Sequence, residues 1–261
     1  MSNLLYKIFE KLILNFIPNL ATRYNISTER QNSFYKSINL DRDFGYIKLN
    51  DVLIKEFKTY YDEQSGMFSE HLILLSSLSK KGFNIKKILE IGTYDGKTSF
   101  ILSKIFPEAE ITTIDLNKNE NSFANTYKRE NNQNIFINNR NKLLSRANNI
   151  SFLEMNSISL CNNTELYDLI WIDGAHGYPV VAMDVINSIR LCNNKGFILI
   201  DDIWTDDISS DKFYKSIGGY ESLNELKKAN LIRDFHLIPK RLSAKNNFPG
   251  KKKYIGFIKN D

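Results

Sequence analysis

The stretch Lys86-Lys-Ile-Leu-Glu-Ile-Gly-Thr-Tyr-Asp-Gly-Lys-Thr-Ser-Phe-Ile-Leu-Ser-Lys104 decides the fold that this sequence predicts. Its first half is a short apolar run, which is typical of a buried strand in a parallel sheet. The run breaks at a turn that contains Gly92 and Gly96, and apolar residues then recur with helical spacing. We therefore expect a strand, a loop and a helix, with the first N–H groups of the helix available to a polar or anionic ligand.

The glycine spacing separates two kinds of cofactor site. A nicotinamide dinucleotide site has the pattern G-x-G-x-x-G, but Tyr94 holds the second glycine position, and no Tyr-x-x-x-Lys pair for hydride transfer is present. The pattern E-x-G-x-x-x-G from Glu90 to Gly96 instead resembles the first motif of class I S-adenosylmethionine-dependent methyltransferases. The resemblance implies a Rossmann-like α/β fold with a doubly wound, mostly parallel, seven-stranded sheet. It also implies cofactor contacts from Glu90, Gly92, Thr93, Tyr94, Gly96 and Thr98.

Two further strands carry polar residues at their ends. The run from Glu110 ends at Asp115, about 20 residues past the glycine loop, where a doubly wound fold places an acid against ribose hydroxyls. An acid there can also be a simple turn former. The strand from Ile150 to Met155 precedes Asn156 and Ser157, which the resemblance places beside the adenine amino group. Asn156 stands where the family more often has Asp, and its amide oxygen can still accept a hydrogen bond.

The most chemically informative part of the chain contains two buried strands that end in carboxylates. Asp173 follows one, and Asp201 and Asp202 end the other. In a parallel sheet such ends meet beside the cofactor loop, so we expect the three acids to converge there. Crowded carboxylates require a cation, and an all-oxygen set suits Mg²⁺, Mn²⁺ or Ca²⁺ better than zinc. Alternatively, each Asp caps its own turn.

His176 lies three residues after Asp173 and is the best candidate for a general base, since imidazole titrates near neutral pH. A loop histidine can equally be a plain hydrogen-bonding residue. The segments Ile172-Asp-Gly-Ala-His176 and Ile200-Asp-Asp-Ile203 resemble metal-dependent sugar O-methyltransferases of the macrocin and mycinamicin type. That resemblance implies that Asp173, which also faces the cofactor, binds the divalent ion with Asp201 and Asp202, and that His176 is the catalytic base.

The composition of the chain limits its partners, its compartment and its domain organisation. The 261 residues are 42% hydrophobic, and the net charge of +5 comes from dispersed lysines without a nucleic-acid-binding signature, so we expect no nucleic-acid partner. Cys161 and Cys192 form no paired framework, which suits a reducing compartment such as the cytoplasm. We expect a helical extension over 1–80 and a methyltransferase domain over 81–261.

Residues 3–20 have the apolar spacing of an amphipathic helix that packs on the domain or on a second subunit of a homo-oligomer, or else lies on a membrane surface. Residues 21–50 are polar and expected to be irregular, and two helices are expected within 51–78. A last helix is expected around 220–229, followed by strands over 231–238 and 254–258, the last of them reversed.

These features predict transfer of a methyl group from S-adenosylmethionine to a hydroxyl of a sugar-like small molecule, assisted by a metal ion. Two alternatives stay open. The acceptor can be another small molecule, with a catechol-like, phosphate or nitrogen group, because pocket walls come from variable segments. The chain can also be a cofactor-binding scaffold without catalysis, although such a scaffold has no use for three convergent acids.

Overall fold

The computed structural model describes residues 25–62, 70–125, 132–205, 216–241 and 253–260. The chain divides into two compact units, one made of residues up to 77 with 239–253, the other of residues 78–238 with the end of the chain. Each is described by itself, and the expected boundary near residue 80 stays a prediction. The helix expected over 3–20 lies outside the described residues.

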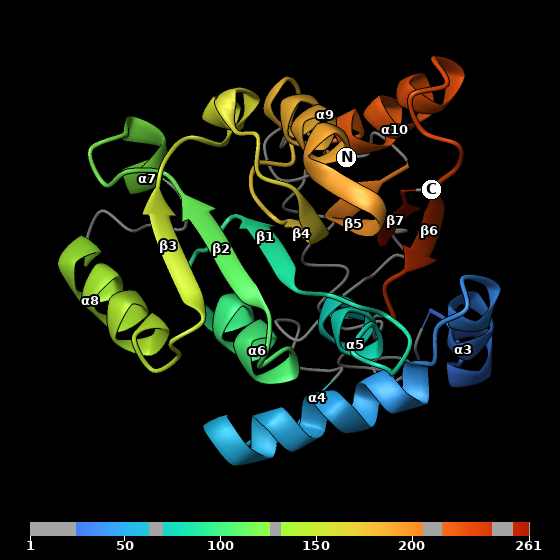
Figure 1. Cartoon of the computed structure of the whole chain (residues 1–261), viewed down its shortest axis with the longest axis horizontal. Helices are drawn as coiled ribbons and strands as arrows, with labels where there is room; N and C mark the ends of the chain where they lie inside the picture. Colours follow the sequence, from blue (N-terminus) through green and yellow to red (C-terminus); the bar gives the residue numbers. More distant parts are fainter. Residues whose placement is uncertain (1–24, 63–69, 126–131, 206–215, 242–252, 261) are drawn as a thin grey trace, which may run out of the picture. The chain divides into compact units, whose positions relative to one another are not determined.

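The second unit is built on a seven-stranded sheet (Figure 1). Its strands are β1 (Lys87–Ile91), β2 (Glu110–Asp115), β3 (Ile150–Glu154), β4 (Tyr167–Ile172), β5 (Cys192–Trp204), β6 (His236–Pro239) and β7 (Lys253–Lys259). They lie in the order β3-β2-β1-β4-β5-β7-β6, and the first five pair in parallel. The predicted doubly wound, mostly parallel α/β fold is confirmed.

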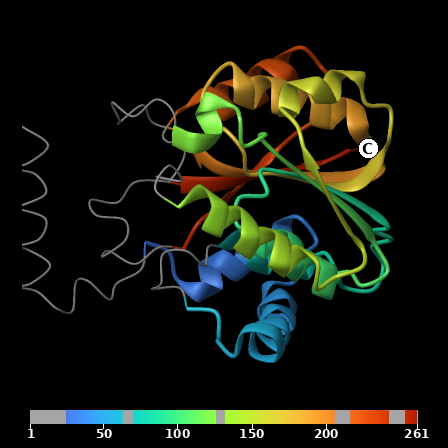
Figure 2. The ribbon, with the colours of Figure 1, turned by 90° about the vertical axis from the view of Figure 1, so that its left-hand side faces the viewer.

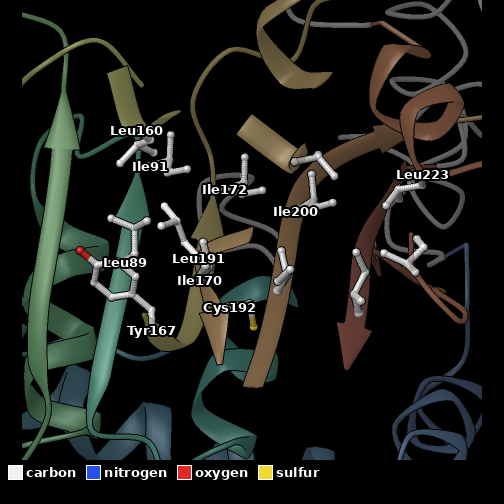
Figure 3. Close-up of a cluster of buried hydrophobic side chains, with 14 of the residues drawn as sticks. Leu89, Ile91, Leu160, Tyr167, Ile170, Ile172, Leu191, Cys192, Ile200 and Leu223 are labelled. Atoms are coloured by element: carbon white, nitrogen blue, oxygen red, sulfur yellow. The ribbon is translucent and has the colours of Figure 1, made fainter. Parts of the chain in front are cut away.

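Strand β7 is reversed, as expected. Asn260, just past its end, exchanges backbone hydrogen bonds with Lys195 and Gly196 near the start of β5, at 2.5 and 2.9 Å. Gly256, in the middle of β7, instead lies beside Ile200, nearer the end of β5. The two strands therefore run antiparallel, and Figure 3 shows their arrows pointing in opposite directions. Strand β6 is shorter than the predicted 231–238, since it begins at His236.

Helices cover both faces of the sheet (Figure 2). Helices α6 (Lys97–Ile105) and α8 (Gln133–Leu144) lie on one face. The 3₁₀ helix η2 (Ser157–Asn162), α9 (Val180–Leu191) and α10 (Gly218–Lys228) lie on the other, while the short α7 (Asn121–Asn125) follows β2. The helix predicted around 220–229 corresponds to α10.

The hydrophobic core follows the two-residue alternation of extended strands. The side chains that pack between the sheet and α9 come from alternate positions of β1, β4 and β5 (Figure 3): Leu89, Ile91, Ile170, Ile172, Ile198 and Ile200. Each is at most 2% exposed. The intervening positions face α6, and Glu90 is one of them, which explains how a carboxylate comes to be buried in this strand.

The first unit contains α3 (Thr28–Ser37), α4 (Arg42–Phe57) and α5 (Glu70–Ser77). The expectation that residues 21–50 are irregular was therefore wrong. The side chains of Ser27 and Asp41 cap α3 and α4 by accepting from backbone N–H groups, a local signal that low apolar content had obscured. The buried Arg42 and Glu70 form an ion pair at 2.7 Å. No helix among the described residues is long and apolar enough to cross a membrane.

Candidate functional site

The strand order reverses between β1 and β4, and ligands of doubly wound folds bind at the carboxyl ends of the strands at such a point. The loops that leave the two strands are joined there. Asp173 donates its backbone N–H to Ile91 O at 2.8 Å. The backbone N–H groups of Gly92 and Thr93 both donate to Ile114 O of β2, at 2.9 and 3.1 Å. The predicted cofactor loop is thus fixed by bonds from both neighbouring strands.

Gly92 is required by a close approach of two loops. Its φ is +104°, and a Cβ atom added there would lie 2.3 Å from the carbonyl oxygen of Asp173. That separation is far shorter than real Cβ contacts, and the nearest atoms belong to the backbone of Asp173 and Gly174, which cannot move aside as a flexible side chain can. The absence of a side chain therefore lets the cofactor loop pack against the loop that carries Asp173 and His176.

Helix α8 supports the same loop from its other side. Gly96, at φ +78°, precedes α6, and an added Cβ would lie 2.9 Å from Leu144 Cδ2 of α8. The Tyr94 ring lies 5.4 Å from the Phe136 ring of α8. Thr98 follows in the first turn of α6 and is partly buried. The role of Phe136 was missed from the sequence, where it stands in an Asn-rich stretch that gave no apolar periodicity.

Glu90 lies beneath the loop, fully buried, and not at its surface. Its Oε2 accepts hydrogen bonds from the hydroxyls of Ser99 on α6 and Thr113 on β2, the latter at 2.6 Å. Thr113 is also 2.6 Å from the Thr93 hydroxyl, so a chain of polar groups reaches the loop. Burial raises the pKa of Glu90 to about 7, while the two hydrogen bonds act in the opposite direction. Ser99 and Thr113 were not predicted.

Asp115 and Asn156 both make backbone contacts. The Asp115 carboxylate accepts from Tyr94 N at 2.9 Å and from Leu116 N at 2.8 Å, so it holds the cofactor loop to the end of β2. The Asn156 Oδ1 accepts from Ile158 N at 3.1 Å and thereby caps η2, which begins at Ser157. The oxygens of a carboxylate and of an amide can each accept more than one hydrogen bond.

At the end of β4, Asp173 and His176 lie close together. The Asp173 Oδ1 is 3.8 Å from His176 Nε2. The imidazole is 8% exposed, which shields it from water on most sides. A carboxylate at this distance stabilises the imidazolium form once the ring has taken up a proton.

The three predicted metal ligands, Asp173, Asp201 and Asp202, do not form a close group as Asp173 and His176 do. Asp201 is buried near the end of β5, and Asp202, the next residue, has a left-handed φ of +53° and is partly exposed. Successive side chains of an extended strand leave on opposite faces, so the two acids share a direction only where the backbone departs from that pattern. Over the described ranges, no group of three or more His, Cys, Asp or Glu side chains is arranged to hold a metal ion. Asp173, Asp201 and Asp202, as placed, therefore do not form a three-carboxylate metal centre by themselves.

Comparisons with known proteins agree with this geometry. A family described as "Methyltransferase domain" matches residues 89–203, from β1 to the end of β5. No curated protein matched the chain. Among solved structures, the O-methyltransferase TomG from Streptomyces achromogenes, involved in tomaymycin synthesis and solved in complex with SAM, is 17% identical with a TM-score of 0.51, over 90% of this chain and 100% of that one.

Two further structures show lower scores. A cofactor-bound protein from MTB is 12% identical with a TM-score of 0.49, over 89% of this chain and 88% of that one. A precorrin-6y C5,15-methyltransferase from Geobacter metallireducens is 12% identical with a TM-score of 0.48, over 71% and 87%. At such identities the structural likeness concerns the fold. The family match and the paired loops at the switch point lead to one conclusion: residues 89–203 match a methyltransferase domain, and the protein is an S-adenosylmethionine-dependent methyltransferase.

Proposed function

We propose that this enzyme methylates a hydroxyl oxygen of a sugar-like small molecule, with His176 as the general base. The observation that carries the proposal is the Asp173–His176 pair, whose atoms Oδ1 and Nε2 lie 3.8 Å apart on a loop bonded to the cofactor loop. A base that must act on an acceptor beside the sulfonium methyl group belongs at this junction. The resemblance of Ile172–His176 and Ile200–Ile203 to sugar O-methyltransferases supports the choice of acceptor.

In the proposed reaction, the acceptor hydroxyl loses its proton to His176 as its oxygen attacks the methyl carbon. An O–C bond forms, the methyl carbon–sulfur bond breaks, and the electron pair of that bond stays on sulfur. The products are a methyl ether, S-adenosylhomocysteine and a proton on His176. The Asp173 carboxylate stabilises the resulting imidazolium. Because displacement requires oxygen, carbon and sulfur in line, the fixed distance between the two loops contributes through position.

The metal requirement stays a proposal of its own. Mg²⁺ or Mn²⁺ is the cation that Asp173, Asp201 and Asp202 are predicted to bind, and a bound ion would supply an electrophile for the acceptor oxygen. The described residues do not gather these three acids into a metal centre. We therefore assign no step of the reaction to an ion. If methyl transfer continues at an unchanged rate in EDTA, the metal-dependent part of the proposal is wrong while the base mechanism stands.

Two aromatic residues near the acids differ in what they can offer an acceptor. Tyr178, two residues after His176, is 77% exposed, whereas Trp204 at the end of β5 is 8% exposed. An exposed ring has a free apolar face that can pack against the C–H groups of a sugar ring. We propose that Tyr178, rather than Trp204, contacts the acceptor.

The test compares two histidine variants. His176→Ala should lower kcat by roughly 10²- to 10⁴-fold, the usual contribution of a general base, and leave binding of S-adenosylhomocysteine unchanged by calorimetry. His236→Ala is the matched control, because that residue is an exposed histidine on β6. It should have the wild-type rate. Full activity of His176→Ala would contradict the base assignment. Cofactor binding by a wild-type protein that methylates no hydroxyl acceptor would favour the scaffold alternative.

A further inference from the structure

One face of helix α8 lies against the cofactor loop. Phe136, Arg140 and Leu144 are four residues apart and therefore share this face. The Phe136 ring lies 5.4 Å from the ring of Tyr94. Towards the other end of the helix, a Cβ added at Gly96 would lie 2.9 Å from Leu144 Cδ2 and 3.5 Å from Arg140 Cγ. This face thus contacts the loop at two points, with a cationic side chain between two apolar ones.

Arg140 connects the same face of α8 to strand β3. Its guanidinium carbon lies 4.1 Å from the centre of the Phe152 ring, and its Nη2 lies 3.5 Å from Oε1 of Glu154, the last residue of the strand. A guanidinium suits both partners, because its flat face packs on an aromatic ring while its N–H groups pair with a carboxylate. Arg140 is 1% exposed and the Glu154 side chain is 34% exposed, so the cation is the buried partner of the pair.

The ends of β2 and β3 show why a cation belongs at this position. Asp115 and Glu154 lie opposite each other in the parallel register, so their side chains leave the sheet on the same face. Like charges on neighbouring strands repel, and a cation beside one of them reduces that repulsion. Asp115 is the acid that holds the cofactor loop, by accepting from Tyr94 N at 2.9 Å. Arg140 therefore attaches α8 to the sheet beside the carboxylate that fixes the loop.

We propose that Arg140 is a positioning residue that holds α8 against β3 and, through Phe136 and Leu144, orders the cofactor loop before the cofactor binds. The inference rests on the predicted location of the cofactor at this loop. It assigns Arg140 no contact with the methyl group or with the acceptor. A loop that is ordered in advance loses less freedom on binding, so the effect of Arg140 should appear in cofactor affinity.

The primary test is calorimetric titration with S-adenosylhomocysteine. Arg140→Met keeps a long unbranched side chain without the charge, and it should weaken binding about tenfold. Arg140→Lys keeps a cation near Phe152 and Glu154, and its affinity should stay within about threefold of the wild type. Equal losses in the two variants would contradict the role of the charge.

Arg146→Met is the matched control. The Arg146 guanidinium also lies over an aromatic ring, that of Phe100 on α6, at 4.5 Å, but the residue follows the end of α8. This variant should bind S-adenosylhomocysteine as the wild type does. A tenfold loss in Arg146→Met as well would show that affinity falls with any arginine of this region, and would overturn the specific assignment.

Amide hydrogen exchange of the free protein tests the loop directly. The N–H of Tyr94 donates to Asp115 Oδ2, and the N–H of Gly96 donates to Thr93 O at 2.9 Å. Both amides should exchange about tenfold faster in folded Arg140→Met than in the wild type, and at the wild-type rate in Arg146→Met. Unchanged exchange at these amides in Arg140→Met would overturn the proposal even if affinity falls.

A second variant tests the contact from the side of β3. Glu154→Gln removes the partner charge and should weaken binding about threefold, with faster exchange in the loop. The double variant with Arg140→Met should lose less affinity than the two single losses combined, because residues in contact are not additive. Glu165→Gln is the control, since Glu165 pairs with Lys87 at 2.6 Å at the start of β1, and it should bind normally. If Arg140→Met is unfolded, wild-type affinity and exchange in Glu154→Gln overturn the proposal.

The outcomes separate this inference from the proposed function. Neither calorimetry nor amide exchange requires an acceptor, so the results do not depend on the role of His176. Failure of the wild type to bind S-adenosylhomocysteine would contradict the cofactor site itself. Normal binding and normal exchange in folded Arg140→Met would overturn the positioning role alone.

Discussion

The two halves of the site, at the ends of β1 and β4–β5, differ in how far the protein itself fixes them. The cofactor loop after β1 is held by backbone bonds to Ile114, by the Asp115 carboxylate and by a glycine with no room for a side chain. The acidic half has one close pair, Asp173 and His176 at 3.8 Å, and Asp201 and Asp202 do not join it in a three-residue metal site. Among the described residues, more contacts thus fix the cofactor loop than fix the acidic half.

The largest effect should come from breaking the junction of the two halves. Gly92→Ala would place a Cβ 2.3 Å from Asp173 O at a φ of +104°, so we expect a loss of about 4 kcal/mol in the free energy of unfolding, with loss of S-adenosylhomocysteine binding. Urea denaturation and calorimetry measure both. Gly82→Ala is the control, because its φ is +114° and no described atom lies within 4 Å of the added Cβ. It should cost only about 1 kcal/mol and leave binding intact.

The buried support of the cofactor loop should give the next effect, as a pH dependence. Burial raises the pKa of Glu90 from 4.5 to about 7, so the folded protein binds this proton more tightly than the unfolded chain does. Its contribution to stability is complete below about pH 4.5 and is lost as the pH rises to about 7, by up to about 3 kcal/mol. Glu90→Gln should flatten the fall in the free energy of unfolding over this range, measured by urea denaturation at several pH values.

The pH experiment has one control variant and one expected residual slope. Glu110→Gln alters an exposed acid on the neighbouring β2 and should leave the wild-type slope unchanged. A smaller slope should persist in Glu90→Gln, because the raised pKa of Asp184, about 6, acts in the same direction. An unchanged slope in Glu90→Gln would show that the loop does not depend on the protonation of this carboxyl.

The smallest effect should come from the acceptor side. Tyr178→Ala removes an exposed ring, and we expect KM for a sugar acceptor to rise about three- to tenfold with kcat and cofactor affinity unchanged. Steady-state kinetics at saturating S-adenosylmethionine measure the change. Tyr60→Ala removes another exposed tyrosine, 66% exposed, and should leave KM unchanged. An equal rise in both variants would mean that Tyr178 has no specific contact with the acceptor.

Most of the sheet could be predicted because its strands are continuous apolar runs that end in polar turns, as from Leu169 to Asp173. Helix α3 and the part of α4 before residue 51 were missed, since the evidence for each start is a single capping side chain, at Ser27 and Asp41. The sequence also could not show whether Asp173, Asp201 and Asp202, at the ends of two strands, lie close together. Where Asp202 points depends on a left-handed backbone that no residue type in the sequence indicates.

The position of β7 has a consequence for how the chain is made. β5 pairs with β4 on one side and with β7 on the other, yet some fifty residues separate the end of β5 from the start of β7. During synthesis the five parallel strands therefore exist for a time with the edge of β5 uncovered, and such an edge pairs readily with other chains. Ribosome-stalled chains that stop before Lys253 should recruit chaperones more strongly than chains in which β7 has emerged.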